Sequence, residues 1–196
     1  MITINTTEED MSDNQMLNNL NKDSASVIGA IPELTYVGNK ILRTKTLDVS
    51  LEEGLAIGEL LLKALFVYKE LTGLGVGLAA PQIGISSNVF VTHTKDISKI
   101  YINPKITFYS DERNIYKECC LSSGHFWCDV QRSKNITITY MNEKGEVITE
   151  NYEDRLSRII QHEYDHLQGI VNLDKATVGT IDYRFGDPKE EKIREL

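Results

Sequence analysis

The chain has 196 residues, is 41% hydrophobic and 26% charged, and carries a net charge of −8, which predicts one globular domain with enough length for a core. The acidic balance argues against electrostatic binding to nucleic acid or to anionic membranes, and no apolar run approaches the roughly 20 residues that span a bilayer. The amino end, acidic at Glu8, Glu9 and Asp10, has neither a signal-peptide nor a transit-peptide pattern. The cytoplasm is therefore the expected compartment.

Residues 1–27 are polar and rich in Asn, Thr, Ser, Asp and Glu. Such a composition predicts a flexible or loosely docked extension, with a short helix around Met11–Leu20 as the alternative. From Tyr36 to Asp48 the chain reads as an irregular arm. Ser50 followed by Glu53 is a capping-box pattern, and the leucines behind it recur at helical spacing. We therefore expect an amphipathic helix from Ser50 to about Glu70 that packs on the core.

A glycine-rich stretch follows this helix: Gly75-Val76-Gly77-Leu78-Ala79-Ala80-Pro81-Gln82. Its alternating glycines permit unusual backbone angles and close approach of another backbone. It matches neither a dinucleotide fingerprint, because no strand leads into it, nor a phosphate loop, because no Gly-Lys-Ser/Thr ends it. Small residues followed by one amide suit an extended peptide lying against the backbone, with Gln82 reaching a carbonyl. A plain turn is the alternative.

Four segments after this stretch have the composition of strands. They are Val89–Thr92, Lys99–Ile102, Ile106–Tyr109 and Asn114–Leu121. Asn103-Pro104 is expected to separate the second from the third. Lys134–Met141 alternates apolar and polar residues, and it is expected to pair with Glu146–Asn151 as an antiparallel hairpin through the Asn142–Gly145 turn.

The most informative stretch is Gln161-His162-Glu163-Tyr164-Asp165-His166, an H-E-x-x-H pattern. It is expected on a helix that begins after an N-cap at Asp154 and stops at Gly169. Residues four apart lie on one helical face with Cβ atoms roughly 5–6 Å apart, so both imidazoles can reach one cation. Glu163, one step round, can act on a water molecule without being a ligand.

A catalytic metal usually takes three protein ligands and keeps another position open. His93 and His125 are available as the third ligand, although a lone histidine is more often a surface or core residue. Cys119, Cys120 and Cys128 lie within ten residues of one another. Three clustered cysteines make a poor disulfide framework and fit a reducing compartment better.

Read together, Gly75–Gln82, Glu118–Ser122 and Gln161–His166 resemble the three motifs of the peptide deformylases, in the same order. These enzymes are metal hydrolases that remove the N-formyl group from the initiating methionine of new polypeptides. The resemblance covers about residues 30–175. It implies an α+β fold, in which antiparallel sheets pack around a central metal-binding helix together with an N-terminal helix. Residues 28–186 would form the catalytic domain, and residues 187–196 a charged tail.

The resemblance assigns Cys120, His162 and His166 as ligands of one divalent metal ion per chain. A thiolate with two imidazoles suits Zn²⁺ or Fe²⁺ better than Mg²⁺ or Ca²⁺. In the family the native ion is Fe²⁺, and Zn²⁺ or Ni²⁺ often replaces it in purified samples.

The resemblance also implies the roles of the remaining site residues. Glu163 would take a proton from water and pass it to the leaving amine. The Gln82 amide and the backbone N–H of Leu121 would hold the developing oxyanion. The peptide would lie extended along Val76–Gly77 and Cys119, with its methionine side chain in an apolar pocket lined partly by Ile159.

N-formylmethionyl peptides and nascent chains are the implied substrates, with a transient encounter with the ribosome. Neither nucleic acid nor a membrane is an expected partner, and a monomer is the default. Arg155 and Arg158 lie on roughly the same face of the metal helix, where surface ion pairing is expected.

Two departures from the family pattern keep an alternative open. Cys119 stands where the family has glycine, and Ser123–Trp127 replaces the usual continuation of that motif. The alternative is a metal-binding pseudoenzyme with a binding role or an altered substrate. Gln82 and Glu163 argue against it, because neither is needed to hold a metal. A zinc endopeptidase would take its third ligand downstream, and no histidine follows His166.

Overall fold

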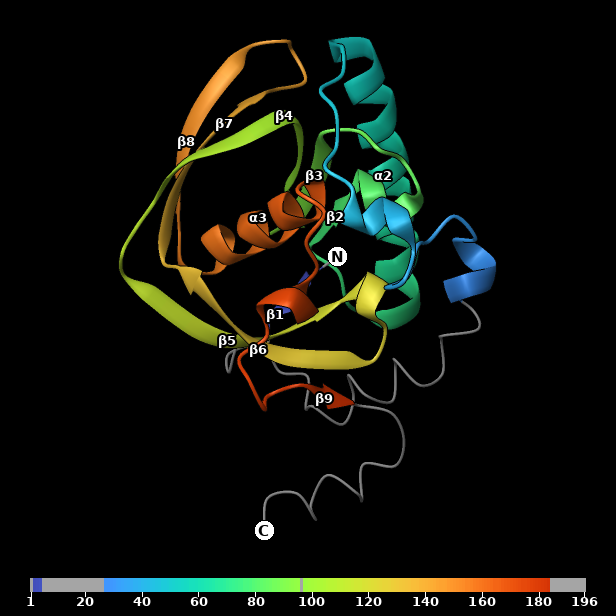
Figure 1. Ribbon diagram of the computed structural model, residues 1–196. Coiled ribbons are helices and arrows are strands. Elements are labelled where there is room, and N and C mark those ends of the chain that lie inside the picture. The colour runs from blue at the N-terminus through green and yellow to red at the C-terminus, as the bar shows by residue number, and fades with distance from the viewer. Residues whose placement is uncertain (1, 5–26, 96, 184–196) are drawn as a thin grey trace.

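The computed structural model describes residues 2–4, 27–95 and 97–183, which combine two longer helices with two antiparallel sheets (Figure 1). The helices are α2 (Leu51–Thr72) and α3 (Asp154–Leu167). One sheet has the strand order β1 (Ile2–Ile4), β5 (Arg113–Cys120), β6 (Phe126–Ser133), β9 (Asp182–Tyr183). The other has the order β2 (Gly77–Ala79), β3 (Val89–Thr94), β4 (Ile97–Tyr109), β7 (Asn135–Met141), β8 (Val147–Glu153).

The five-stranded sheet separates the two helices. Successive side chains of a strand point to opposite faces, so Val89 and Val91 of β3 join the core under α2, whereas Phe90 joins the core under α3. α3 therefore lies inside the molecule, with the four-stranded sheet close to it as well (Figure 1). This arrangement confirms the predicted α+β fold with antiparallel sheets around a central helix.

Helix α2 follows its sequence signals closely. The Ser50 hydroxyl accepts the Glu53 N–H, the Glu53 carboxylate accepts the Ser50 N–H, and Gly73 ends the helix with φ 72°. A Cβ on Gly54 would lie 2.6 Å from Ile102, and one on Gly58 would lie 2.6 Å from Ile100. The two glycines thus let the helix approach β4, and the predicted core-packing helix is confirmed.

The strand predictions were right for the hairpin and partly wrong before it. β7 and β8 pair antiparallel, with Ile138 opposite Glu150. Asn103-Pro104 does not split β4, which continues from Ile97 to Tyr109. The pairing with β7 is irregular there, and Asn103 takes a positive φ of 51°. The Asn103 side chain stabilises this irregular stretch, because its Oδ1 accepts the Val49 N–H and its Nδ2 donates to the Val49 C=O.

Helix α3 ends as predicted but begins differently. Gly169, with φ 76°, follows its C-cap residue Gln168. The N-cap is Glu153 rather than Asp154, because β8 stays extended to its last residue and runs directly into the helix. Asp154 is instead the first helical residue and has a positive φ of 47°.

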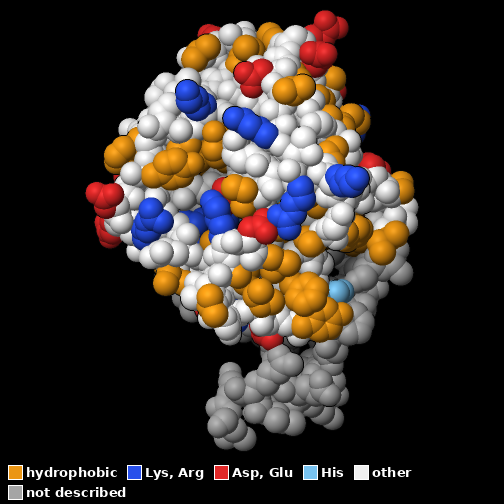
Figure 2. Space-filling model, in the orientation of Figure 1, with side chains coloured by type: hydrophobic (Ala, Val, Ile, Leu, Met, Phe, Trp, Pro, Cys, Tyr) orange, Lys and Arg blue, Asp and Glu red, His pale blue; other side chains and the backbone are white. Residues whose placement is uncertain are grey.

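Short 3₁₀ helices also occur in the described residues, and two of them carry the candidate site residues Gln82 and Leu121. They are η1 (Lys40–Arg43), η2 (Ala80–Ile83), η3 (Leu121–Ser123) and η4 (Asn172–Lys175). The predicted segments Met11–Leu20 and 187–196 lie outside the described residues. In the described part of the chain no helix is long and apolar enough to cross a bilayer, and the three cysteines there form no disulfide. Lysines and arginines are scattered over the face in Figure 2 rather than gathered into one patch.

Candidate metal centre

Three buried side chains from two elements meet at the centre of the molecule. Cys120, the last residue of β5, faces His162 and His166 of α3. The ligand atoms lie within 4.8 Å of one another, and Cys120 Sγ is 3.2 Å from His166 Nε2. The rings of His162 and His166 are 5.0 Å apart between centroids, as expected for residues one helical turn apart.

The orientation of His162 is fixed from behind by Glu118. Its Nδ1 is 3.1 Å from a carboxylate oxygen of Glu118, so its Nε2 faces Cys120 and His166. That Nε2 is buried and lies near the sulfur of Cys120. A metal-binding histidine usually has this arrangement, with one ring nitrogen bonded to a carboxylate and the other directed at the ion.

Glu118 is itself held by two buried arginines. Arg132 of β6 donates two bonds to its carboxylate, at 2.6 and 2.8 Å, and Arg158 donates one at 2.6 Å. Arg132 also bonds Asp165, which in turn accepts from Lys175. The expected surface role of Arg158 is therefore wrong: the side chain is 1% exposed and part of an interior ionic network.

The catalytic candidate Glu163 lies fully buried against the glycine-rich stretch. A Cβ on Gly77 would lie 2.5 Å from the Glu163 Oε1 atom, so only glycine leaves room for the carboxylate there. The group that approaches Gly77 here is a side chain of α3, whereas the alternating glycines predicted another backbone. This carboxylate lies against β2, the edge strand of the five-stranded sheet, and Glu163 directly follows the candidate metal ligand His162 in the sequence.

Gln82 in η2 points its amide at the same centre. Its Oε1 accepts the Ala79 N–H at 2.9 Å, which leaves Nε2 directed at Cys120 Sγ, 3.5 Å away, and at Ser122 Oγ, 3.3 Å away. Leu121 follows the cysteine directly and opens η3. The amide of Gln82 and the backbone at Leu121 therefore border the three ligand atoms.

Thr35, just before the irregular arm, and Val37 within it tie these two segments together, and the sequence did not predict this. The Thr35 N–H donates to Gln82 O at 2.9 Å, and the Val37 N–H donates to Ser122 O at 2.8 Å. Glu118, Arg132 and Ser122 were also not singled out as site residues. Glu118 and Ser122 lie in the second motif, but nothing in the pattern distinguishes a buried glutamate from an exposed one.

The substrate-binding candidates border the site as well. Val76 packs on Ile159, which is fully buried one turn before His162. Cys119 is 8% exposed and precedes the metal-binding candidate Cys120. Val76 directly precedes β2 and Cys119 lies in β5, and the extended peptide is expected between the edges of these two strands.

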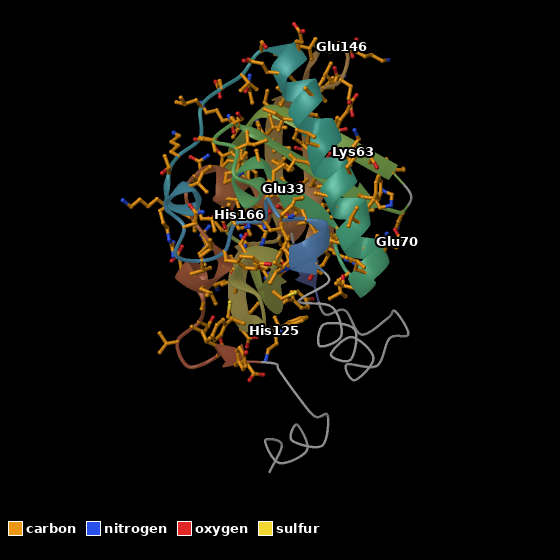
Figure 3. All side chains as sticks on the ribbon, turned by 90° about the vertical axis from the view of Figure 1, so that its right-hand side faces the viewer. Glu33, Lys63, Glu70, His125, Glu146 and His166 are labelled. Atoms are coloured by element: carbon orange, nitrogen blue, oxygen red, sulfur yellow. The ribbon has the colours of Figure 1, made fainter. Side chains whose placement is uncertain are left out.

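The other two histidines lie elsewhere. His93 packs edge-on against Phe66 and bonds Ser98 at 3.0 Å. His125 lies at the periphery beside Tyr183, far from His166 in Figure 3. Neither reaches the cluster of Cys120 and the α3 histidines.

The electrostatics of the cluster favour metal binding. Burial raises the pKa of the Cys120 thiol, but the charge of His166 and the bonds from both imidazoles outweigh it and hold that pKa well below its ordinary value. Burial lowers the pKa of His162, whereas its bonds with Cys120 and Glu118 raise that pKa to about 9. The site thus prefers the thiolate, which is the form of cysteine that binds metals.

The donor set fits a divalent transition metal. One thiolate and two imidazoles are soft and borderline ligands, whereas Mg²⁺ and Ca²⁺ take oxygen ligands. Three protein ligands also leave a fourth position for water or substrate, as catalytic sites require. Cys120, His162 and His166 would therefore hold the ion and leave a further position free for water or substrate.

Comparison with known proteins gives a consistent match. The family model of polypeptide deformylase matches residues 31–180. The peptide deformylase of Pseudothermotoga lettingae is 41% identical over 144 residues, which are 74% of this chain and 82% of that protein. The crystal structure of peptide deformylase from Thermotoga maritima superposes with a TM-score of 0.68 at 34% identity, and covers 74% of this chain and 96% of that one.

A second solved structure superposes almost as well. It is a peptide deformylase from Synechococcus elongatus in complex with actinonin, with a TM-score of 0.66 at 30% identity, and the match covers 74% of this chain and 79% of that one.

Proposed function

The chain belongs to the peptide deformylase family, and we propose that the site formed by Cys120, His162 and His166 carries out the reaction of that family. The reaction is hydrolysis of the N-formyl group from the N-terminal methionine of newly synthesised polypeptides, with release of formate. The observation that supports this assignment best is the buried cluster of Cys120, His162 and His166 with the Gln82 amide directed at the Cys120 sulfur. The comparisons give no support to a pseudoenzyme.

Members of this family are metalloenzymes, and we propose Fe²⁺ as the native ion, with Zn²⁺ or Ni²⁺ replacing it in purified samples. The thiolate and two imidazoles accept all three of these ions. When bound, the ion supplies Lewis acidity to a water molecule and to the formyl oxygen.

Glu163 is the proposed general base and acid. It takes a proton from the attacking water and delivers a proton to the amine nitrogen as the C–N bond breaks. Its burial against Gly77, one residue after the candidate ligand His162, supports this role. Burial also keeps bulk water away from the transferred proton.

Gln82 and Leu121 are the proposed oxyanion donors. The bond from Ala79 N–H fixes the Gln82 amide so that its Nε2 faces the reaction centre. A donor held in this way needs no reorganisation as negative charge develops on the formyl oxygen, which is why such donors contribute strongly.

The peptide is proposed to lie extended between the edges of β2 and β5, with its backbone along Val76–Gly77 and Cys119. The methionine side chain would enter the apolar surroundings of Ile159, which packs on Val76. We propose that the enzyme works in the cytoplasm as a monomer and meets nascent chains at the ribosome.

The direct test is to load the protein anaerobically with Fe²⁺ and to measure formate release from a formyl-methionyl tripeptide. The assignment predicts formate and an intact tripeptide with a free methionine amine. Peptide-bond cleavage without formate would identify an endopeptidase instead. No reaction despite one bound ion per chain would contradict the assignment.

A further inference from the structure

The described residues at the amino end, 2–4, form a short strand. Ile2, Thr3 and Ile4 are consecutive β-branched residues, which favour extended backbone. They form β1, which pairs antiparallel with the end of β5: Ile2 lies opposite Cys120, Thr3 opposite Cys119 and Ile4 opposite Glu118 (Figure 1). The strand therefore lies on the backbone that leads into the proposed metal ligand.

β1 occupies the side of β5 that would otherwise be an open edge. The opposite side of β5 pairs with β6 from Arg113 to Cys119. An uncovered edge next to an active site is where an extended peptide adds as a further strand. β1 also contacts α3, the helix that carries His162 and His166.

We infer that Ile2–Ile4 occupies the place of the substrate backbone on β5, so that the chain's own amino-terminal segment competes with peptides for the site. The inference rests on the proposed function, which puts the substrate backbone along Cys119. Two strands cannot pair with the same edge of β5 at Cys119 at the same time. Peptides would therefore bind only to molecules in which β1 has left β5.

The covalent tether sets the strength of this competition. A three-residue strand makes few hydrogen bonds and is weak by itself, but residues 5–26 keep it attached. Tethering gives such a segment an effective concentration up to the millimolar range. The apparent KM rises by the reciprocal of the open fraction, so it would be about tenfold higher if one molecule in ten were open. kcat at saturating peptide would stay the same.

The first test compares two proline variants. Thr3→Pro removes the backbone N–H at the centre of β1 and disfavours its pairing, whereas Thr6→Pro makes the same change outside β1. With Fe²⁺-loaded protein and a formyl-methionyl tripeptide, we expect KM to fall at least about threefold in Thr3→Pro. We expect kcat to stay the same there, and both constants to stay the same in Thr6→Pro. Equal KM values in wild type and Thr3→Pro would overturn the inference.

A second test detects the strand without measuring turnover. Directly opposed residues of an antiparallel pair have Cβ atoms about 4.5–5.5 Å apart, so a cysteine at position 3 can approach Cys119 closely enough to form a disulfide. Thr3→Cys, loaded with Zn²⁺ and treated with oxidised glutathione, should lose two hydrogens as the link forms and glutathione is released. Peptide mass mapping should locate it between positions 3 and 119.

The matched control is Ile4→Cys, whose partner in the pair is Glu118, and little linkage is expected from it. Adding Cys119→Ser to Thr3→Cys should abolish the link. Equal linkage from positions 3 and 4 would overturn the inference. If no variant released formate, the proposed function would fail, while a link between positions 3 and 119 would still support occupation of the edge and its absence would overturn it.

Discussion

Two networks of charged side chains differ in burial, and one of them contacts the candidate metal ligand His162 through Glu118. The network behind the metal site joins Glu118 to Arg132 and Arg158, and all three side chains are 0–1% exposed. Burial raises the pKa of Glu118, but the charge and bonds of Arg132, with help from His162, hold that pKa well below its ordinary value. This carboxylate is therefore charged in the folded protein.

The second network lies on the five-stranded sheet. Glu150 of β8 accepts bonds from Lys99, Tyr140 and Tyr152, and Tyr101 bonds Tyr152 at 3.1 Å. Lys99 and Glu150 are 37% and 33% exposed. Water therefore reaches both charges of this pair.

Similar bonds therefore have different consequences for stability when their burial differs. Removing one charge from a buried network leaves its partners without solvation, which costs several kcal/mol. Removing one from a partly exposed network lets water replace the lost bonds. The first network should therefore govern both stability and the metal site, and the second should contribute to stability alone.

The largest expected effect is that of Glu118→Gln. It removes the negative charge that Arg132 and Arg158 share in the interior, and it replaces the carboxylate behind His162 with a neutral amide, which is a weaker acceptor. We expect a loss of about 3–5 kcal/mol in the free energy of unfolding and metal binding weakened about 10–100-fold. Urea unfolding and metal titration would measure these. Unchanged values for both would show that the buried network does not govern the site.

Gly77→Ala changes the site without altering any charge. The new Cβ would meet the Glu163 carboxylate at 2.5 Å, so the carboxylate must move away. Because misplacing a catalytic group by about 1 Å can reduce the rate 10²-fold, we expect kcat to fall about that much, with metal binding retained. Gly29→Ala is the matched control, because a Cβ there meets nothing within 4 Å. Full activity in Gly77→Ala would contradict the proposed role of Glu163.

Glu150→Gln should give the smallest effect. We expect about 1 kcal/mol lost in the free energy of unfolding at pH 7, with kcat and KM unchanged. A change in kcat would break the distinction between the two networks.

The loss in Glu150→Gln should depend on pH. Burial raises the pKa of Glu150, but bonds from Tyr152, Lys99 and Tyr140 outweigh it, so its folded pKa is lowered. The stabilisation is therefore complete above the unfolded pKa of about 4.3 and disappears as pH falls through the lower folded pKa. Unfolding of wild type and variant at pH 7 and in acid should converge. A constant difference at all pH values would contradict the charge-based explanation.

The sequence predicted the elements whose burial follows a simple period. Helix α2 has a capping box and regular leucines, and in β7 Ile136, Ile138 and Tyr140 are buried. Three motifs in order were enough to indicate both the family and the cluster of Cys120 with two histidines.

The sequence failed where polar residues are buried. β6 was not predicted: its segment ends in Arg132 and Ser133, polar residues that interrupt an apolar pattern although both are buried. Arg158 was misassigned for the same reason. The period of a pattern carries no information on which charges find partners inside the fold, and Glu118, Arg132 and Arg158 find theirs across three different elements.

The most direct test of the proposed role of Glu163 separates metal binding from proton transfer. Glu163→Ala and wild type would be loaded anaerobically with Fe²⁺, and bound metal and formate release from a formyl-methionyl tripeptide would be measured on the same samples. We expect one ion per chain in both proteins and formate release by the wild type alone. An active Glu163→Ala, or a variant that no longer binds the ion, would contradict it.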